Sequence, residues 1–190
     1  MMMQLRGFTL IEMLIAVAIF AFLIMLAGPM YAKFMGNSQI RNAGDGMLNG
    51  VQQAQSIAVR GNTLARLVVD PTTGTGGWRI LETVDGTEPA GLPNPVQVYS
   101  VTDGSPHASV VPTPAGATQI TFDGFGRIVS NLDATPTISC INVDHSTMTG
   151  LRSLRVVISN TGIGIGTPKL CDPAAASTEP QACPAAIPCT

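Results

Sequence analysis

The chain has 190 residues, of which 45% are hydrophobic and only 12% are charged, and its formal net charge at pH 7 is -2. The charged fraction is about half of that in an average soluble domain. The length suits one globular domain with an appendage, and the small net charge excludes a protein that binds nucleic acid or anionic lipid through bulk positive charge.

The N-terminal part of the chain predicts a membrane-spanning helix. Residues Met13 to Ala32 carry no charge, and a stretch of this length can cross a hydrocarbon core of about 30 Å as a helix. A removable secretory signal peptide would need a shorter apolar stretch and then a small-residue cleavage site. No such site follows the run, and the apolar pattern continues beyond Lys33. We therefore expect an anchor that stays in the mature protein.

Glu12 places a carboxylate inside this apolar part of the chain. An unpaired carboxylate in hydrocarbon costs about 3 kcal/mol or more, and such residues are usually functional. Glu12 is therefore expected to have a partner. A position at the level of the lipid headgroups is the alternative, since the carboxylate would cost little there.

The residues around Glu12 resemble the class III leader junction of type IV pilins and pseudopilins: Arg6-Gly7-Phe8-Thr9-Leu10-Ile11-Glu12-Met13-Leu14. The resemblance implies that a prepilin peptidase cuts between Gly7 and Phe8 and methylates the new N-terminus at Phe8. It also implies that Glu12 pairs with the N-terminal amine of a neighbouring subunit. That pairing would neutralise both charges in the membrane and set the register of the next subunit.

Pro29 lies deep in the apolar run and matches a proline that is common in the helices of this family. Proline removes a backbone donor and kinks or opens a helix. With Gly28 beside it, local opening of the helix is expected when the subunit leaves the bilayer.

The helix is predicted to continue to a stop signal at Gly61-Asn62. Apolar residues recur at spacings of three and four, so one face of the helix should pack on a sheet. Glycines in the same part weaken a helix by up to about 1 kcal/mol each relative to alanine, which predicts a bend. The apolar residues are Ile40, Ala43, Met47, Leu48, Val51, Ala54 and Ile57, and the glycines are Gly36, Gly44, Gly46 and Gly50.

The chain after this helix is predicted to form β-strands separated by turns. One long helix followed by a run of strands favours the α+β class, with the helix packed on an antiparallel sheet. A turn at 72–76 and a Pro- and Gly-rich loop at 85–95 should separate some of the strands. The expected strands are 64–69, 77–81, 96–101, 119–122, 127–129, 138–143, 154–159 and a short one at 163–165.

The order of these elements resembles the GspH/FimT/FimU group of minor pilins and minor pseudopilins. The segment Phe122 to Arg127 between two strands, and a terminal strand pair that ends in Gly and Cys, carry this resemblance beyond the leader junction. The resemblance implies a subunit that primes assembly at the filament tip. It does not cover the Pro- and Ala-rich tail, 172–190.

An even number of cysteines near a loop-rich C-terminus predicts two disulfides outside the cytoplasm. Three pairings are open, and we prefer Cys140–Cys171 with Cys183–Cys189. A zinc site is the alternative, but the spacing contains no C-x2-C pair and the tail contains no histidine.

No pattern of catalytic residues is evident, so we predict that the chain is not an enzyme and holds no cofactor or metal. His145 lies between Asp144 and Ser146, but the side chains of a catalytic triad must converge in space, which neighbours in the chain seldom do. His107 and His145 are interpreted as polar loop residues. Trp78 and Phe125 are interpreted as core or sheet-face residues rather than a ligand platform.

Some relatives in this group are DNA receptors for natural transformation and resemble one another in a Gly-Arg-x-Arg sequence near the last strand. The corresponding residues here are Gly162-Ile163-Gly164-Ile165. Phosphate binding depends on Lys and Arg, so the sequence argues against DNA as a partner. Arg152 and Arg155 remain and are expected to face solvent.

Together these features predict a leader peptide (1–7), a transmembrane and filament-core helix (8–35), its amphipathic continuation (36–61), a β-rich head (62–171) and a disulfide-linked tail (172–190). The leading hypothesis is a structural minor pilin that helps to initiate or cap a type IV pilus. The alternatives are a minor pseudopilin of a type II secretion system and a pilus-borne DNA receptor. The expected partners are prepilin peptidase, other pilins or pseudopilins and inner-membrane lipid, with the head in the periplasm and later on the pilus or pseudopilus.

Overall fold

The structure is a computed structural model that describes residues 8–70, 76–83, 95–160, 166–184 and 189. Most of the expected turn at 72–76 and loop at 85–95, and the whole expected strand at 163–165, lie outside the described residues. The chain divides into two compact units, Met1–Met35 and Gly36–Thr190.

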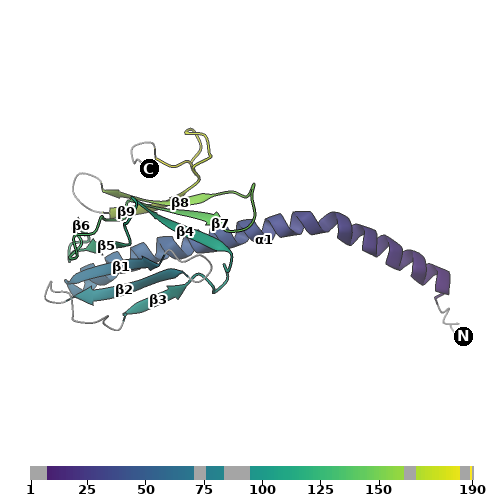
Figure 1. The fold of residues 1–190 in the computed structure, drawn as a ribbon, viewed down its shortest axis with the longest axis horizontal. Helices are drawn as coiled ribbons and strands as arrows, with labels where there is room; N and C mark the ends of the chain where they lie inside the picture. The colour runs from purple at the N-terminus through teal and green to yellow at the C-terminus, as the bar shows by residue number, and fades with distance from the viewer. Residues whose placement is uncertain (1–7, 71–75, 84–94, 161–165, 185–188, 190) are drawn as a thin grey trace, which may run out of the picture. The chain divides into compact units, whose positions relative to one another are not determined.

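The first element is one continuous helix, α1, which spans Leu10–Gly61 (Figure 1). Its last turn is closed by hydrogen bonds from the N–H of Asn62 to the carbonyl of Val59 (3.4 Å) and from the N–H of Thr63 to the carbonyl of Ala58 (3.2 Å). Asn62 has a φ of 50°, a left-handed conformation that asparagine tolerates better than most residues. This Schellman arrangement ends α1 at the predicted stop.

The strands form two antiparallel sheets among the described residues. Sheet A has the order β3-β2-β1-β5-β6, and sheet B has the order β4-β7-β8-β9. One long helix packed on antiparallel sheets confirms the predicted α+β class. The strands are β1 (Leu64–Asp70), β2 (Gly77–Thr83), β3 (Gln97–Ser100), β4 (Ala108–Thr113), β5 (Gln119–Phe122), β6 (Ile128–Val129), β7 (Cys140–His145), β8 (Leu154–Asn160) and β9 (Gly166–Cys171).

Strands β4 and β9 were not predicted from the sequence, and both contain a proline. Pro112 lies in β4 and Pro168 lies in β9. A proline argues against a central strand because it cannot donate to the ladder, but an edge strand tolerates it. Both strands are edges of sheet B, which explains why the local pattern misled the prediction.

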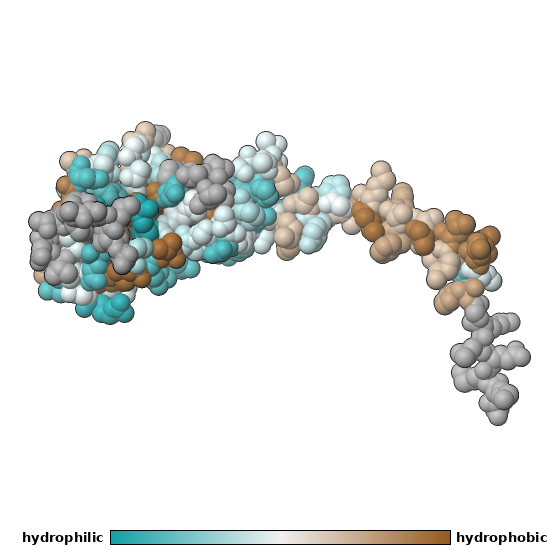
Figure 2. All heavy atoms as spheres, turned by 60° about the horizontal axis from the view of Figure 1, so that its bottom comes forward, coloured by the Kyte–Doolittle hydropathy of each residue, from teal (hydrophilic) through white to brown (hydrophobic). Residues whose placement is uncertain are grey.

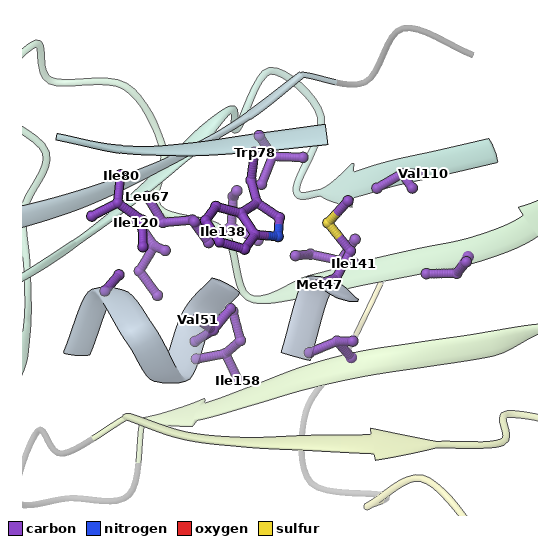
Figure 3. Packing of buried hydrophobic residues seen from close by; sticks show 14 of the residues in the cluster. Met47, Val51, Leu67, Trp78, Ile80, Val110, Ile120, Ile138, Ile141 and Ile158 are labelled. Carbon is purple, nitrogen blue, oxygen red and sulfur yellow. The ribbon is translucent and has the colours of Figure 1, made fainter. Parts of the chain in front are cut away.

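The core of the head lies between the two sheets, where α1 enters it. Figure 3 shows Met47 and Val51 of α1 among side chains from both sheets. The predicted apolar stripe of α1 is buried in this core, except that Leu48 is only partly buried. Side chains that surround α1 include Leu67, Ile80 and Ile120 of sheet A and Val110, Ile141 and Ile158 of sheet B.

The glycines of this half of α1 let the helix approach the sheets closely. A Cβ at Gly50 would lie 2.6 Å from the indole ring of Trp78, and one at Gly46 would lie 2.6 Å from the ring of Tyr99. The two rings stack with centroids 5.7 Å apart, and the Trp78 Nε1–H donates to the carbonyl of Gly46 (2.8 Å). Close packing against these rings is thus a role for the two glycines that the sequence prediction did not include.

Candidate processing and assembly segment

The described part of the N-terminal segment begins at Phe8, directly after the predicted cleavage site, and Gly7 lies outside the described residues. The side chain of Phe8 is 77% exposed. Helix α1 begins two residues later at Leu10. The peptide unit next to the predicted scissile bond is therefore not part of the helix.

Thr9 caps the start of α1. Its hydroxyl oxygen accepts a hydrogen bond from the N–H of Glu12 (3.3 Å), and its carbonyl accepts one from the N–H of Met13 (3.2 Å). Threonine followed three residues later by glutamate is the sequence signature of a capping box, and Glu12 lies in the first turn, where the helix dipole favours an anion. Thr9 was not predicted as a helix cap, although the Thr-x-x-Glu spacing in the sequence indicates one.

The N-terminal half of α1 presents an apolar surface. Large hydrophobic side chains from Leu10 to Phe34 are exposed in the single chain, and Figure 2 shows them along this part of the helix. By length and composition, α1 is one candidate membrane span in the described part of the chain, and none of its most apolar window is buried in the structure. An exposed apolar surface of this extent is typical of a membrane or protein interface.

Pro29 lies inside α1, which is assigned as helix on both sides of it. A Cβ at Gly28 would meet no atom within 4 Å, so packing in the chain does not require glycine at this position. Local opening of the helix at Gly28 and Pro29 remains a prediction.

The two histidines lie side by side in the head, with ring centroids 5.7 Å apart. Nδ1 of His145 accepts hydrogen bonds from the N–H of Met148 (3.1 Å) and of Thr147 (3.3 Å). His145 is the last residue of β7 rather than a loop residue as expected, and its ring holds the turn that follows the strand. Among the described residues, no cluster of three or more His, Cys, Asp or Glu could hold a metal ion.

Phe125 differs from its predicted position in the core or on a sheet face, because its side chain is 74% exposed. It lies in the turn between β5 and β6, where Oδ1 of Asp123 accepts the N–H groups of both Phe125 and Arg127 (2.9 Å each). The Arg127 guanidinium lies 5.0 Å from the Phe125 ring centroid and pairs with Asp123 (2.8 Å). Burial tends to raise the pKa of Asp123, but its hydrogen bonds with Arg127 and Phe125 outweigh this and keep the pKa below its usual value.

The arginines that remained for DNA binding are engaged within the head. Arg152 forms an ion pair with Asp172, and Arg155, which is partly buried, donates through Nε to Oδ1 of Asn142 (2.7 Å). The expectation that both face solvent was therefore wrong for Arg155. Lys169 reaches the carbonyls of the tail at Pro180 (3.4 Å) and Ala182 (3.3 Å). The Ile163 and Ile165 positions lie outside the described residues.

The disulfides connect Cys140 to Cys189 and Cys171 to Cys183, so the preferred pairing was wrong. Cys140 lies on β7 and Cys171 on β9, with β8 between them. Strands two positions apart are about 9.5 Å apart, which is too far for a disulfide. The Cα atoms of Cys140 and Cys189 are 5.8 Å apart, and those of Cys171 and Cys183 are 4.9 Å apart. Both bonds therefore join the tail to sheet B.

Ionic and backbone contacts hold the same tail. The N–H of Asp172 donates to the carbonyl of Gln181 (2.7 Å), and Oδ1 of Asp172 accepts the N–H of Ala174 (2.8 Å). Burial tends to raise the pKa of Asp172, but the hydrogen bond from the N–H of Ala174 and the contact with Arg152 outweigh it and keep the pKa below its usual value. The tail thus closes on itself at the end of β9.

Comparisons with known proteins agree with this arrangement of an anchor and a head. The family model described as type II transport protein GspH matches residues 43–162, and the model described as the prokaryotic N-terminal methylation motif matches residues 2–28. No curated protein matches the chain.

Among solved structures, the chain is similar to the type IV minor pilin FimU of Pseudomonas aeruginosa strain PAO1 in two crystal forms. For the first, the TM-score is 0.52 at 17% identity, over 72% of this chain and 92% of that chain. For the second, the TM-score is 0.48 at 16% identity, over 68% and 91%. The first of these likenesses shows that the two chains share a fold.

Proposed function

Because the chain belongs to the GspH family, we propose that it is a minor pilin that a prepilin peptidase processes and that helps to initiate or cap a type IV pilus. The observation that carries the proposal is the presence in one chain of the methylation motif at 2–28 and the GspH head at 43–162. The motif implies processing by the peptidase and assembly with other pilin-like subunits. The place at the tip is our inference.

In this proposal the peptidase cuts between Gly7 and Phe8 and methylates Phe8. A protease needs an extended, accessible peptide at the scissile bond, and helical backbone is neither. The cap at Thr9, which starts α1 only at Leu10, supports the cleavage site because it leaves Phe8 outside the helix.

Glu12 then pairs with the free amine at Phe8 of a neighbouring subunit. Inside the bilayer two opposite charges attract far more strongly than in water, because the effective dielectric constant is low. Each charge alone would be costly there, so a subunit is held best in the register that brings the two together. Glu12 has no ion pair among the described residues of the single chain, which agrees with a partner supplied by another subunit.

In this proposal the protein is a single-pass subunit of the inner membrane with its head in the periplasm, before it moves into the filament. Two disulfides in the head support this orientation, because disulfides form and persist in oxidising compartments and are rare in the cytoplasm.

A minor pseudopilin of a type II secretion system is the second candidate. The family model that matches the head carries the description of a type II transport protein, which favours this reading. A DNA receptor has less support, because Arg152, Arg155 and Lys169 are used in contacts within the head.

Deletion of the coding sequence in the source bacterium tests the proposal. A minor pilin predicts loss of surface pili, restored by the intact gene but not by one encoding Gly7→Val, and the mature chain should appear in sheared filaments. Loss of secreted protein with pili retained would favour the pseudopilin. Loss of transformation with pili retained would favour the DNA receptor, and an effect on none of the three would reject the assembly role.

A further inference from the structure

Strand β3 is an edge of sheet A that carries exposed apolar side chains. Among the described strands, β3 pairs with β2 alone. Val98 in β3 is 66% exposed, and Val96, the residue just before the strand, is 49% exposed. An exposed apolar edge strand is a template for pairing with another chain, and proteins usually protect such edges.

The register of β3 shows which backbone groups face the open edge. Val101 donates its N–H to the carbonyl of Gly76 (2.8 Å), so this is a hydrogen-bonded position of the ladder. Hydrogen-bonded and non-hydrogen-bonded positions alternate, which makes Trp78–Tyr99 hydrogen-bonded and Arg79–Val98 not. The N–H and carbonyl of Val98 therefore point away from β2, and no hydrogen bond within the described residues uses them.

The other edges among the described strands are protected or short. Pro112 occupies a position on β4 whose backbone faces outward, because the bond from Ser146 N–H to the carbonyl of His107 (2.8 Å) sets the alternation. Strand β9 contains Pro168, and the tail closes over its end at Asp172. Strand β6 has only two residues. Among these edges, β3 is the one that can accept a further strand of useful length.

A groove of about 300 Å³ lies beside the start of β3, between this strand and α1. Gln53, Ser56 and Arg60 of α1 line one side, and Val96 and Gln97 line the other. The Oε1 atom of Gln53 is buried and has no hydrogen-bond partner among the residues that the structure describes. Leaving a buried acceptor without a hydrogen-bond partner costs about 1–3 kcal/mol of stability. A donor from a binding partner would satisfy Gln53 Oε1 and recover this cost.

Arg60 supplies a charge at the same place. Its side chain is exposed, and it forms no ion pair among the described residues. Within the described part of the chain, the groove thus combines an acceptor without a hydrogen-bond partner and a cation without an ion pair, beside a strand edge that pairs with no further strand. A small apolar ligand would leave all three unused, whereas an extended peptide can use them together through its backbone, a donor side chain and a carboxylate.

We propose that β3 and this groove bind an extended strand from another pilin-like subunit, which adds to sheet A at its open edge. The added strand places a backbone donor and acceptor on Val98, an apolar side chain against Val98, a donor near Gln53 Oε1 and an acidic group near Arg60. This inference rests on the proposed function, because it takes the partner to be a neighbour in the same assembly.

Photocrosslinking in the source bacterium tests the surface with the full chain. The crosslinking amino acid p-benzoylphenylalanine is placed at Val98, or at Val111 as the matched control, since Val111 is 52% exposed on the edge strand β4. We expect an adduct at position 98, mapped by mass spectrometry to a strand of another chain that carries a prepilin junction, and little at position 111. An adduct absent at 98, equal at both positions, or formed only with a second copy of this chain or with a protein lacking the junction overturns the proposal.

Substitutions at Val98 separate the backbone from the side chain. Val98→Pro removes the outward N–H and keeps the ladder to β2, which an edge strand tolerates, whereas Val98→Thr keeps the donor and the branched shape. We expect about fivefold less Val98→Pro than wild type in sheared filaments, the effect of one lost backbone hydrogen bond, and a normal amount of Val98→Thr. Equal incorporation of the two variants overturns the inference.

Gln53→Leu gives an independent readout, because it removes the unpaired acceptor. The head should unfold at the same temperature as wild type or a higher one, followed by Trp78 fluorescence in the detergent-solubilised chain, while incorporation falls. Unchanged incorporation counts against the groove. If the wild-type chain is found in filaments but position 98 gives no crosslinked adduct, only the binding surface at β3 is rejected. If the wild-type chain is absent from filaments, the proposed function is rejected, and this inference with it.

Discussion

Thr9 and Glu12 act together at the start of α1, and the proposed position in the membrane would increase the value of their contact. The Thr9 hydroxyl satisfies the N–H of Glu12, which would otherwise be one of the orphan donors of a helix start. In water such a donor finds a solvent molecule, but in hydrocarbon it has none. The cap therefore fixes the first turn that presents the Glu12 carboxylate.

Thr9→Val should weaken incorporation without blocking processing. Valine has the shape of threonine but no acceptor, and loss of a helix cap costs about 1 kcal/mol, or about fivefold in the population of the ordered first turn. We expect normal leader removal on an immunoblot and about fivefold less protein in sheared filaments. Thr9→Ser keeps the hydroxyl and is the control. Equal incorporation of the two variants would show that the cap is not used.

Glu12→Val and Glu12→Gln should both insert into the membrane and be cut normally, yet be depleted from filaments. Valine removes the polar group, whereas glutamine keeps the shape and hydrogen bonding but not the charge. If charge pairing sets the register, both variants fail to a similar extent. Normal incorporation of Glu12→Gln, measured against membrane-bound protein in the same cells, would leave hydrogen bonding as the interaction and contradict the ion pair.

At the scale of elements, the contact between α1 and sheet A depends on the absence of side chains at two helix positions. Alanine at an exposed glycine stabilises a helix by about 1 kcal/mol. At Gly50 the added Cβ would lie 2.6 Å from an indole ring that a hydrogen bond to Gly46 holds in place. Steric overlap should therefore exceed the gain in helix propensity.

Gly50→Ala should destabilise the head by about 1–3 kcal/mol, the usual cost of overpacking. Trp78 is the only tryptophan, so its fluorescence during denaturant unfolding of the detergent-solubilised chain reports on this contact. Asn49→Ala, at the adjacent exposed helix position, is the control and should be neutral or slightly stabilising. Stabilisation by Gly50→Ala would mean that the helix and the indole are not packed as described.

The strands show which parts of the fold a local sequence pattern predicts and which it does not. Strands β1 and β2 were predicted because the first is rich in β-forming residues and turn residues separate the two. Strands β4 and β9 were missed because a proline breaks the pattern locally while the position at an edge permits it. Burial of Trp78 was predicted from its type, but the exposure of Phe125 depends on the hydrogen bonds that Asp123 makes across its turn.

At the scale of the whole molecule, the sequence indicated the family through its N-terminal motif but did not predict the disulfide pairing of the tail. A peptidase must recognise a short stretch of chain, so the signal around Gly7 and Glu12 is contiguous in the sequence. Disulfide pairing depends instead on which strand lies between Cys140 and Cys171, and this follows only from the order of strands in sheet B. The open edge at β3 is likewise a property of the sheet rather than of its four residues.

The three carboxylates Asp123, Asp133 and Asp172 predict acid sensitivity of the head. In each, burial acts to raise the pKa, and hydrogen bonds to the charged form outweigh it, so the folded pKa lies below the unfolded one. Stabilisation from such a group is complete above the unfolded pKa of about 3.9 and is lost as the pH falls through the folded pKa. The melting temperature should therefore fall as the pH drops below about 4. Asp172→Asn should flatten this dependence, and Asp144→Asn, at an exposed site on β7, should not; equal slopes for both variants would contradict the assignment.

The two disulfides should contribute unequally to the stability of the head. Loop closure by a disulfide stabilises more when the closed loop is longer, by about 3 kcal/mol for a loop of ~12 residues and about 4 kcal/mol for one of ~50. The Cys171–Cys183 bond spans 12 residues and the Cys140–Cys189 bond spans 49. Replacing Cys140 and Cys189 together by serine should therefore lower the free energy of unfolding more than replacing Cys171 and Cys183, measured by denaturant titration of the oxidised full chain in detergent. Paired replacement avoids a free thiol that could reshuffle. The reverse order would show that local clamping of the tail at the end of β9, through Asp172 and Lys169, outweighs the constraint on the unfolded chain.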